Sequence, residues 1–150
     1  MAYYSTKTYG HERGLSCCFR QWRADRHCNM MHGYALAFSF KFEASTLDHN
    51  NWVVDFGGLK WLKAWLENQF DHTTLVAQDD PEMETFRMLH DKKLIDMRVI
   101  PGVGCEKTAE YVFDHVASQI DSLYAGRVKL ISVEVREHPG NSAIIEVSHD

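Results

Sequence analysis

The stretch of sequence that decides the fold is Tyr34-Ala35-Leu36-Ala37-Phe38-Ser39-Phe40-Lys41-Phe42. Every second side chain in it is large and apolar, and small or polar side chains stand between them. A period of two is that of a β-strand, in which successive side chains point to opposite faces of the sheet. The stretch therefore predicts a strand with one face buried under helices and the other turned toward a lumen or a neighbouring subunit.

Other segments also have the composition of β-strands. One precedes the central strand, at about residues 14–22, and no element is expected before it. Two more lie near the end of the chain, at 128–137 and about 143–147. The Pro139-Gly140-Asn141 turn between these two indicates a β-hairpin.

Two segments have the spacing of amphipathic helices, in which apolar residues recur every three or four positions. The first covers about 58–70, with Asp55 before it as a candidate N-terminal cap. Its apolar stripe consists of Leu59, Leu62, Leu66 and Phe70. The second covers about 106–123, and its stripe consists of Ala109, Val112, Phe113, Val116, Ile120 and Leu123. A short helix after Asp79-Asp80-Pro81 and a strand at 94–100 are expected between them. The main order, strand–strand–helix–helix–strand–strand, predicts an α+β fold.

Length and charge limit the class of protein. The 150 residues suit a single domain, 1–150, with its core at about 14–147. Asp and Glu total 21 against 16 Lys and Arg, and the net charge of −5 argues against nucleic acid as the main partner. Arg20, Arg23 and Arg26 nevertheless form a local basic cluster, which fits either a phosphorylated small molecule or a solvated loop.

The sequence also indicates a compartment. It contains no run of about 18 apolar residues, so no membrane span is expected. The first residues are polar and lack the apolar core of a signal peptide. We therefore expect a cytoplasmic protein whose four cysteines are reduced thiols. They are Cys17, Cys18, Cys28 and Cys105.

Three groups of residues could carry chemistry, and each also has a purely structural interpretation. Glu137 continues the apolar alternation of its strand, so it either meets the N–H donors of a ligand on a buried face or ends the strand in water. Cys28 stands four residues before His32, as in a reactive thiol or metal site, although ordinary loops contain such pairs too. Asp71-His72 is the unit of an acid–base relay, or a histidine placed favourably at the end of a helix.

These residues follow one another in a specific order. Cys-x-x-x-His-Gly begins at Cys28, Val-Asp-Phe covers 54–56, and Phe-Asp-His-Thr-Thr-Leu covers 70–75. Glu106 then opens a helix and Glu137 ends a strand. In this joint order and spacing the chain resembles the 6-pyruvoyl-tetrahydropterin synthase and 6-carboxytetrahydropterin synthase family over about residues 14–147.

The resemblance implies a tunnelling fold (T-fold). In that fold a four-stranded antiparallel sheet carries two helices on one face. Subunits join their sheets into a barrel, as a homo-oligomeric trimer or hexamer, and the sites lie between subunits. The order of strands and helices inferred from the spacing above agrees with this fold independently.

By the same resemblance the chain is expected to be a carbon–carbon or carbon–oxygen lyase of the 6-carboxytetrahydropterin synthase type. The substrate would be 7,8-dihydroneopterin triphosphate, and the reaction an early step toward queuosine and other deazapurines. Cys28 would be the catalytic thiol, acting as general base on the pterin side chain, with Asp71 and His72 of a neighbouring subunit completing the relay. Glu137 would anchor the pterin ring and Glu106 would lie near it.

The metal site departs from the family pattern. The family binds zinc through three histidines, but Phe19 and Tyr34 occupy two of those positions and leave His32 as the remaining ligand. Phenylalanine cannot coordinate a metal, and tyrosine is not among the usual ligands of zinc. Three outcomes are open. Zinc is lost while pterin binding persists, zinc is rebuilt with Cys17 or His27, or the chain catalyses a metal-free reaction.

Three hypotheses about function follow. The presence of Cys28, Asp71, His72 and Glu137 together favours the lyase. The altered zinc positions favour a non-catalytic pterin- or purine-binding protein on the same scaffold. A purely structural oligomer is the least supported, because it leaves four separate site residues without a role.

Overall fold

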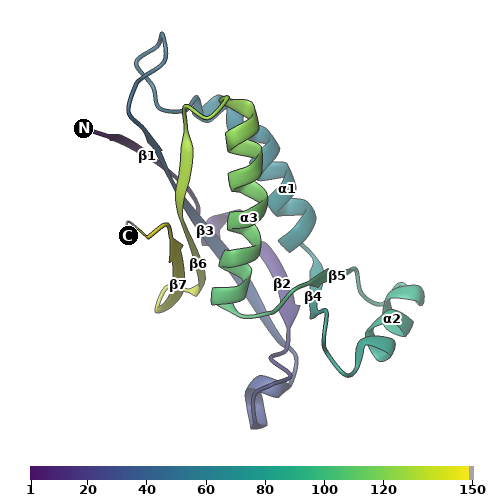
Figure 1. Ribbon diagram of the computed structural model, residues 1–150. Helices are drawn as coiled ribbons and strands as arrows, with labels where there is room; N and C mark the ends of the chain where they lie inside the picture. Colours follow the sequence, from purple (N-terminus) through teal and green to yellow (C-terminus); the bar gives the residue numbers. More distant parts are fainter. Residues whose placement is uncertain (149–150) are drawn as a thin grey trace.

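The computed structural model describes residues 1–148 of the chain (Figure 1). The strands in this range are β1 (Tyr3–Tyr9), β2 (Leu15–Phe19), β3 (His32–Ala44), β4 (Thr73–Ala77), β5 (Met97–Ile100), β6 (Lys129–His138) and β7 (Asn141–Glu146). The α-helices are α1 (Lys60–Phe70), α2 (Met83–Asp91) and α3 (Cys105–Leu123). No helix within residues 1–148 is both long and apolar enough to cross a membrane.

β3 is the centre of the sheet, as the alternation in its sequence predicts. β1 and β2 lie end to end along one side of it, with Tyr9 opposite Phe38 and Leu15 opposite Leu36. β6 lies along the other side and β7 beyond it, and all of these pairings are antiparallel. The predicted antiparallel sheet is therefore confirmed, with its first position shared by two short strands. Gly14, at a φ of 66°, makes the break between them.

The sheet is larger than the expected four strands. β4 pairs with β2 and β5 pairs with β4, and both of these pairings are parallel, so the sheet is mixed. β1 was not predicted from the sequence because most of its side chains are exposed or half-buried, so it has no apolar face. β4 was not predicted because all five of its residues are buried, so its sequence shows no alternation of apolar and polar residues. The expected strand at 14–22 ends already at Phe19, and the one at 94–100 begins only at Met97.

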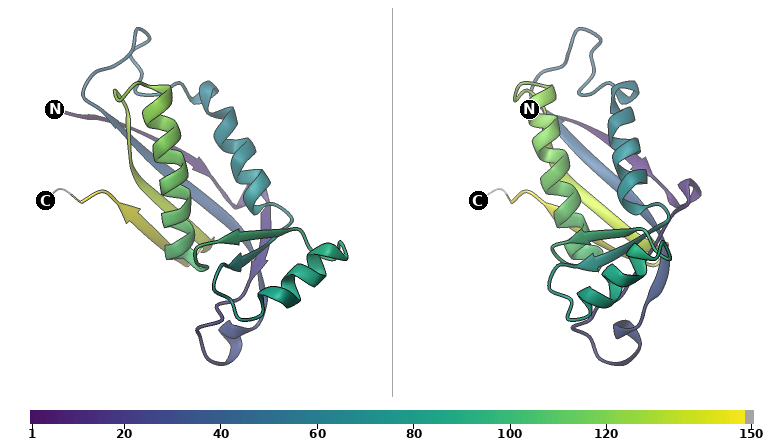
Figure 2. Two further views of the ribbon diagram at one scale, coloured as in Figure 1. Left: turned by 45° about the vertical axis from the view of Figure 1, so that its right-hand side comes forward. Right: turned by 90° about the vertical axis from the view of Figure 1, so that its right-hand side faces the viewer.

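α1 and α3 lie side by side over one face of the antiparallel part of the sheet (Figures 1 and 2). Their apolar stripes and the large side chains of β3 form one core, in which the rings of Phe38 and Phe70 are 4.9 Å apart. Asp55 is an N-terminal cap, but of the 3₁₀ turn Phe56–Leu59 that leads into α1: its carboxylate accepts a hydrogen bond from the Gly57 amide, whereas α1 itself begins without a side-chain cap. The expectation that Leu123 belongs to the α3 stripe is wrong. This residue is 57% exposed, because the helix ends there, beyond the edge of the core.

The segment between β2 and β3 carries Cys28, and a buried ion pair holds it in place. Two nitrogens of the Arg20 guanidinium donate to the two carboxylate oxygens of Asp80, at 2.9 and 2.6 Å. A third nitrogen of Arg20 donates to the Asn29 side chain at 3.1 Å, and Asn29 donates back to the carbonyls of Trp22 and Ala24. Arg20 therefore ties the residue next to Cys28 to the segment before α2.

The basic cluster expected in this segment is largely neutralised. Arg20 is paired with Asp80, and Arg23 forms an ion pair with Asp79 at the surface. Burial alone would raise the pKa of Asp80, but the hydrogen bonds and charge of Arg20 together with the Glu82 amide lower it below its usual value. The solvated-loop interpretation fits these two arginines better than a free phosphate site does.

Leu62→Ala and Leu123→Ala form a matched test of the core. Leu62 in α1 is fully buried, so its truncation should lower the free energy of unfolding by about 3–5 kcal/mol. Leu123 is mostly exposed, so the same change there should cost less than about 1 kcal/mol. Urea denaturation measures both. Equal losses would contradict the placement of Leu123 outside the core.

Arg20→Ala should be strongly destabilising, by about 3 kcal/mol at neutral pH, because it leaves Asp80 charged and buried. Since the folded pKa of Asp80 is lowered, this contribution is present above its unfolded pKa of about 3.9 and disappears as the pH falls through the folded pKa. The difference between wild type and variant should therefore shrink below about pH 4 in urea titrations.

Arg23→Ala is the control for that experiment, because the Arg23–Asp79 pair is exposed to solvent. It should cost less than about 1 kcal/mol. A loss for Arg23→Ala as large as that for Arg20→Ala would show that the Asp80 pair does not hold the segment.

Candidate active site

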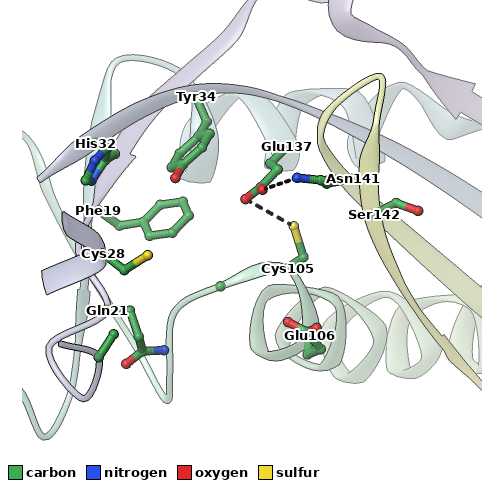
Figure 3. Close-up of a pocket in the computed structure, with 12 residues that line it drawn as sticks. Phe19, Gln21, Cys28, His32, Tyr34, Cys105, Glu106, Glu137, Asn141 and Ser142 are labelled. Atoms are coloured by element: carbon green, nitrogen blue, oxygen red, sulfur yellow. Dashed lines mark hydrogen bonds between the residues drawn. The ribbon is translucent and has the colours of Figure 1, made fainter. Parts of the chain in front are cut away.

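A cavity of about 350 Å³ opens where the end of β6 meets the start of α3 and the segment before β3 (Figure 3). Four of the sequence-predicted residues line it: Cys28, His32, Glu106 and Glu137. The two residues at the altered zinc positions, Phe19 and Tyr34, line it as well. The structure thus brings together residues from five separate parts of the sequence.

Glu137 is half-buried at the end of β6, and both of its carboxylate oxygens have a donor. Asn141 at the start of β7 donates its side-chain N–H to Oε1 at 3.2 Å. Cys105 at the start of α3 donates its thiol to Oε2, with a sulfur–oxygen distance of 3.8 Å. The carboxylate is therefore oriented from two sides and borders the cavity, rather than ending the strand in bulk water. A carboxylate oxygen can accept more than one hydrogen bond, so acceptor capacity remains for a ligand.

Cys105 is a site residue that the sequence analysis missed. Burial raises the pKa of its thiol to about 11, and the negative charges of Glu137 and Glu106 add to this effect. The thiol is therefore protonated at neutral pH and can act as a donor to Glu137. Its place directly before Glu106, in the first turn of α3, was the signal that could have identified it.

Cys28 lies in the short 3₁₀ turn Arg26–Asn29, and its residue is exposed at the mouth of the cavity. Asn29, held by Arg20, follows it directly. Glu106 in the first turn of α3 also lines the cavity, which therefore combines the thiols of Cys28 and Cys105 with two carboxyl groups (Figure 3). In such an arrangement the carboxylate can accept hydrogen bonds from the N–H groups of a heterocyclic ligand. The accessible thiol can at the same time act as a base on a substituent of that ligand.

Asp71 and His72 do not line this cavity. They lie between α1 and β4, where the Nδ1 atom of His72 is 2.8 Å from the Asp71 carboxylate. Asp71 and His72 are thus in contact with each other, but the His72 side chain is 85% exposed and belongs to a separate surface hollow with Leu94 and Asp96. That this pair completes the site of a neighbouring subunit stays a prediction.

The residues at the expected metal positions do not fit zinc. Phe19 lies opposite His32 in the β2–β3 pairing, and the rings of Phe19 and Tyr34 are stacked with their centroids 4.9 Å apart. The cavity wall thus offers a single imidazole where three are needed, and residues 1–148 contain no cluster of three His, Cys, Asp or Glu side chains arranged to hold a metal.

Neither of the two substitute ligands considered from the sequence lines the cavity. Cys17 lies opposite Tyr34 in the β2–β3 pairing, but its side chain is buried in the core. Burial together with the neighbouring Cys18 raises the pKa of its thiol to about 12. His27 is exposed and is not among the residues that line the cavity.

Comparison with known proteins agrees with this architecture. The family model described as 6-pyruvoyl tetrahydropterin synthase matches residues 10–148. Among curated proteins, the 6-carboxy-5,6,7,8-tetrahydropterin synthase of Rickettsia conorii is 30% identical over 95 residues, which is 62% of this chain and 64% of that enzyme. The enzyme of the same name from Rickettsia felis is 29% identical over 108 residues, 70% of this chain and 74% of its own.

Solved structures share the fold at lower sequence identity. An uncharacterized protein from Wolinella succinogenes superimposes with a TM-score of 0.83 at 21% identity, over 99% of both chains. A catalytic-residue mutant of 6-pyruvoyltetrahydropterin synthase from Plasmodium vivax superimposes with a TM-score of 0.72 at 16% identity, over 99% of both chains. The tunnelling fold is therefore confirmed, and with the match of the family model over residues 10–148 the chain belongs to the 6-pyruvoyl tetrahydropterin synthase family.

Proposed function

We propose that this chain is a lyase of the 6-carboxytetrahydropterin synthase type that acts on 7,8-dihydroneopterin triphosphate, in a route toward queuosine and other deazapurines. The observation that carries the proposal is the oriented carboxylate of Glu137, which shares one cavity with the accessible thiol of Cys28. The curated relatives from Rickettsia support the same reaction class.

In this proposal Glu137 accepts hydrogen bonds from the ring N–H and amino groups of the pterin. Asn141 and Cys105 hold the carboxylate in one orientation, so little conformational freedom is lost when the ring binds. Glu106 provides a second acceptor on the α3 side of the ring. A hydrogen bond to a charged acceptor contributes about 1.5–3 kcal/mol, which makes Glu137 the main source of ring affinity.

Cys28 acts on the pterin side chain as general base, and Asp71 with His72 of a neighbouring subunit completes the relay. The Asp71–His72 hydrogen bond is already formed in the single chain, with both groups available at the surface. The proposed assembly is a homo-oligomer, a trimer or a hexamer, with sites between subunits. It would work in the cytoplasm, where its four free thiols stay reduced.

A second candidate is a pterin- or purine-binding protein without catalysis. The observation that favours it is the stacked Phe19–Tyr34 pair at positions where the family has metal ligands, next to an intact Glu137. Both candidates predict binding through Glu137, and they differ in whether Cys28 turns the substrate over.

The decisive experiment incubates the purified protein with 7,8-dihydroneopterin triphosphate and follows the pterin products by chromatography. Turnover is expected for the wild type. Cys28→Ala should reduce the rate at least about a hundredfold, as for loss of a general base, while ligand affinity stays within about threefold. Met88→Ala, at an exposed side chain of α2 that does not line the cavity, is the control and should retain the wild-type rate.

Glu137→Gln should weaken pterin binding about tenfold or more, because the amide replaces one acceptor oxygen with a donor. Isothermal titration calorimetry measures this directly. Binding without turnover in the wild type would overturn the lyase and leave the second candidate. Wild-type affinity in Glu137→Gln would contradict the proposed anchor in both.

A further inference from the structure

Three positions on one wall of the cavity converge: Phe19 on β2 and His32 and Tyr34 on β3. Phe19 and His32 are direct neighbours across the two antiparallel strands, so their side chains stand on the same face of the sheet. Tyr34 is two residues further along β3, which returns it to that face, and its ring stacks on Phe19 at an interplanar angle of 26°. Figure 3 shows all three side chains bordering the same space.

The chemistry of these side chains differs from that of a metal site. Phe19 has no lone pair and only 6% of its surface is exposed, so its ring fills the place where a metal ligand would stand. His32 uses its Nδ1 atom in a 2.7 Å contact with the Met30 carbonyl. The Tyr34 hydroxyl forms no hydrogen bond within the described part of the chain, and it borders the cavity.

Tyr34 borders the cavity, and a phenol hydroxyl that faces a cavity can donate a hydrogen bond to a bound ligand. Tyrosine is not among the usual ligands of zinc, so at this position it suits a hydrogen-bonding role better than coordination.

We propose that the Phe19–Tyr34 pair has replaced the metal of this site with a metal-independent wall. The stacked rings close the cavity on the β2–β3 side, and the Tyr34 O–H donates a hydrogen bond to a side-chain oxygen of the bound pterin. The ligand part of this inference rests on the proposed function, whereas the absence of a zinc requirement rests on the side chains alone.

The first test measures metal directly. Wild-type protein is exposed to zinc, dialysed and analysed by mass spectrometry beside Phe19→His/Tyr34→His. The wild type should retain well under about 0.1 zinc per chain, because a single imidazole cannot hold the ion. The double variant recreates three converging imidazoles and should retain about one. Adding His32→Ala to it should abolish that gain, and cobalt substitution should give a tetrahedral absorption spectrum only in the double variant.

About one zinc in the dialysed wild type, whichever residues hold it, would overturn the inference. Failure of a folded double variant to gain zinc would overturn the convergence of the three positions. Circular dichroism shows whether the double variant folds. If it does not, the zinc content of the wild type still decides the question.

The second test measures the contribution of Tyr34 to binding. Tyr34→Phe should weaken the affinity for 7,8-dihydroneopterin triphosphate about five- to tenfold, by loss of one hydrogen bond. Tyr124→Phe, at the end of α3 and away from the cavity, should leave it unchanged. A chelator such as EDTA should not alter the wild-type affinity.

Equal affinity of Tyr34→Phe and wild type, or binding that disappears with EDTA, would overturn the proposed role of the wall. If the wild type binds no pterin at all, the proposed function fails and with it the ligand part of the inference. The zinc measurements test the metal part independently of pterin binding.

Discussion

Burial of the aromatic face of β3 beneath α1 and α3 is the interaction on which the rest of the structure depends. Phe38, Phe40 and Phe42 are among the largest fully buried side chains, and each has neighbours from both helices or from the flanking strands in one core. Fully burying such a side chain contributes about 1.5–3 kcal/mol. Because the period of the strand is two, this face also fixes the register of every strand paired with β3, since a shift of one residue would expose all three rings.

That register places the site. The β2–β3 pairing sets Phe19 opposite His32, and the β3–β6 pairing brings Arg136 opposite Ala37, one residue before Glu137. The loop that carries Cys28 begins where β2 ends, and the buried Arg20–Asp80 pair holds it against the segment before α2. The cavity therefore lies where β2 and β6 end and where β3, β7 and α3 begin, so the core that fixes the register of the sheet also positions the walls of the cavity.

The central strand, both long helices and the C-terminal hairpin could be predicted from sequence because each has a one-sided apolar pattern. β1 and β4 could not, because β1 lacks a buried face and β4 is buried throughout. In the cavity, the alternation of apolar residues along its strand identified Glu137 as a candidate. It could not reveal which residues donate hydrogen bonds to the carboxylate, since Cys105 and Asn141 come from other elements. The stacking of Phe19 on Tyr34 was equally inaccessible, because it joins residues on two strands whose register only the fold defines.

The two halves of the cavity are built from different parts of the chain, and this explains how one can change without the other. The wall of Phe19, His32 and Tyr34 belongs to β2 and β3, whereas Glu137 is oriented by donors from α3 and β7. Replacing imidazoles by stacked aromatic rings leaves every contact of the Glu137 carboxylate intact. Burial and, after it, the negative charge of Glu137 raise the pKa of the Tyr34 phenol, so a neutral Tyr34 hydroxyl is compatible with the carboxylate beside it. A site divided in this way is compatible with both proposals, a ring-binding carboxylate on one side and a wall without a metal on the other.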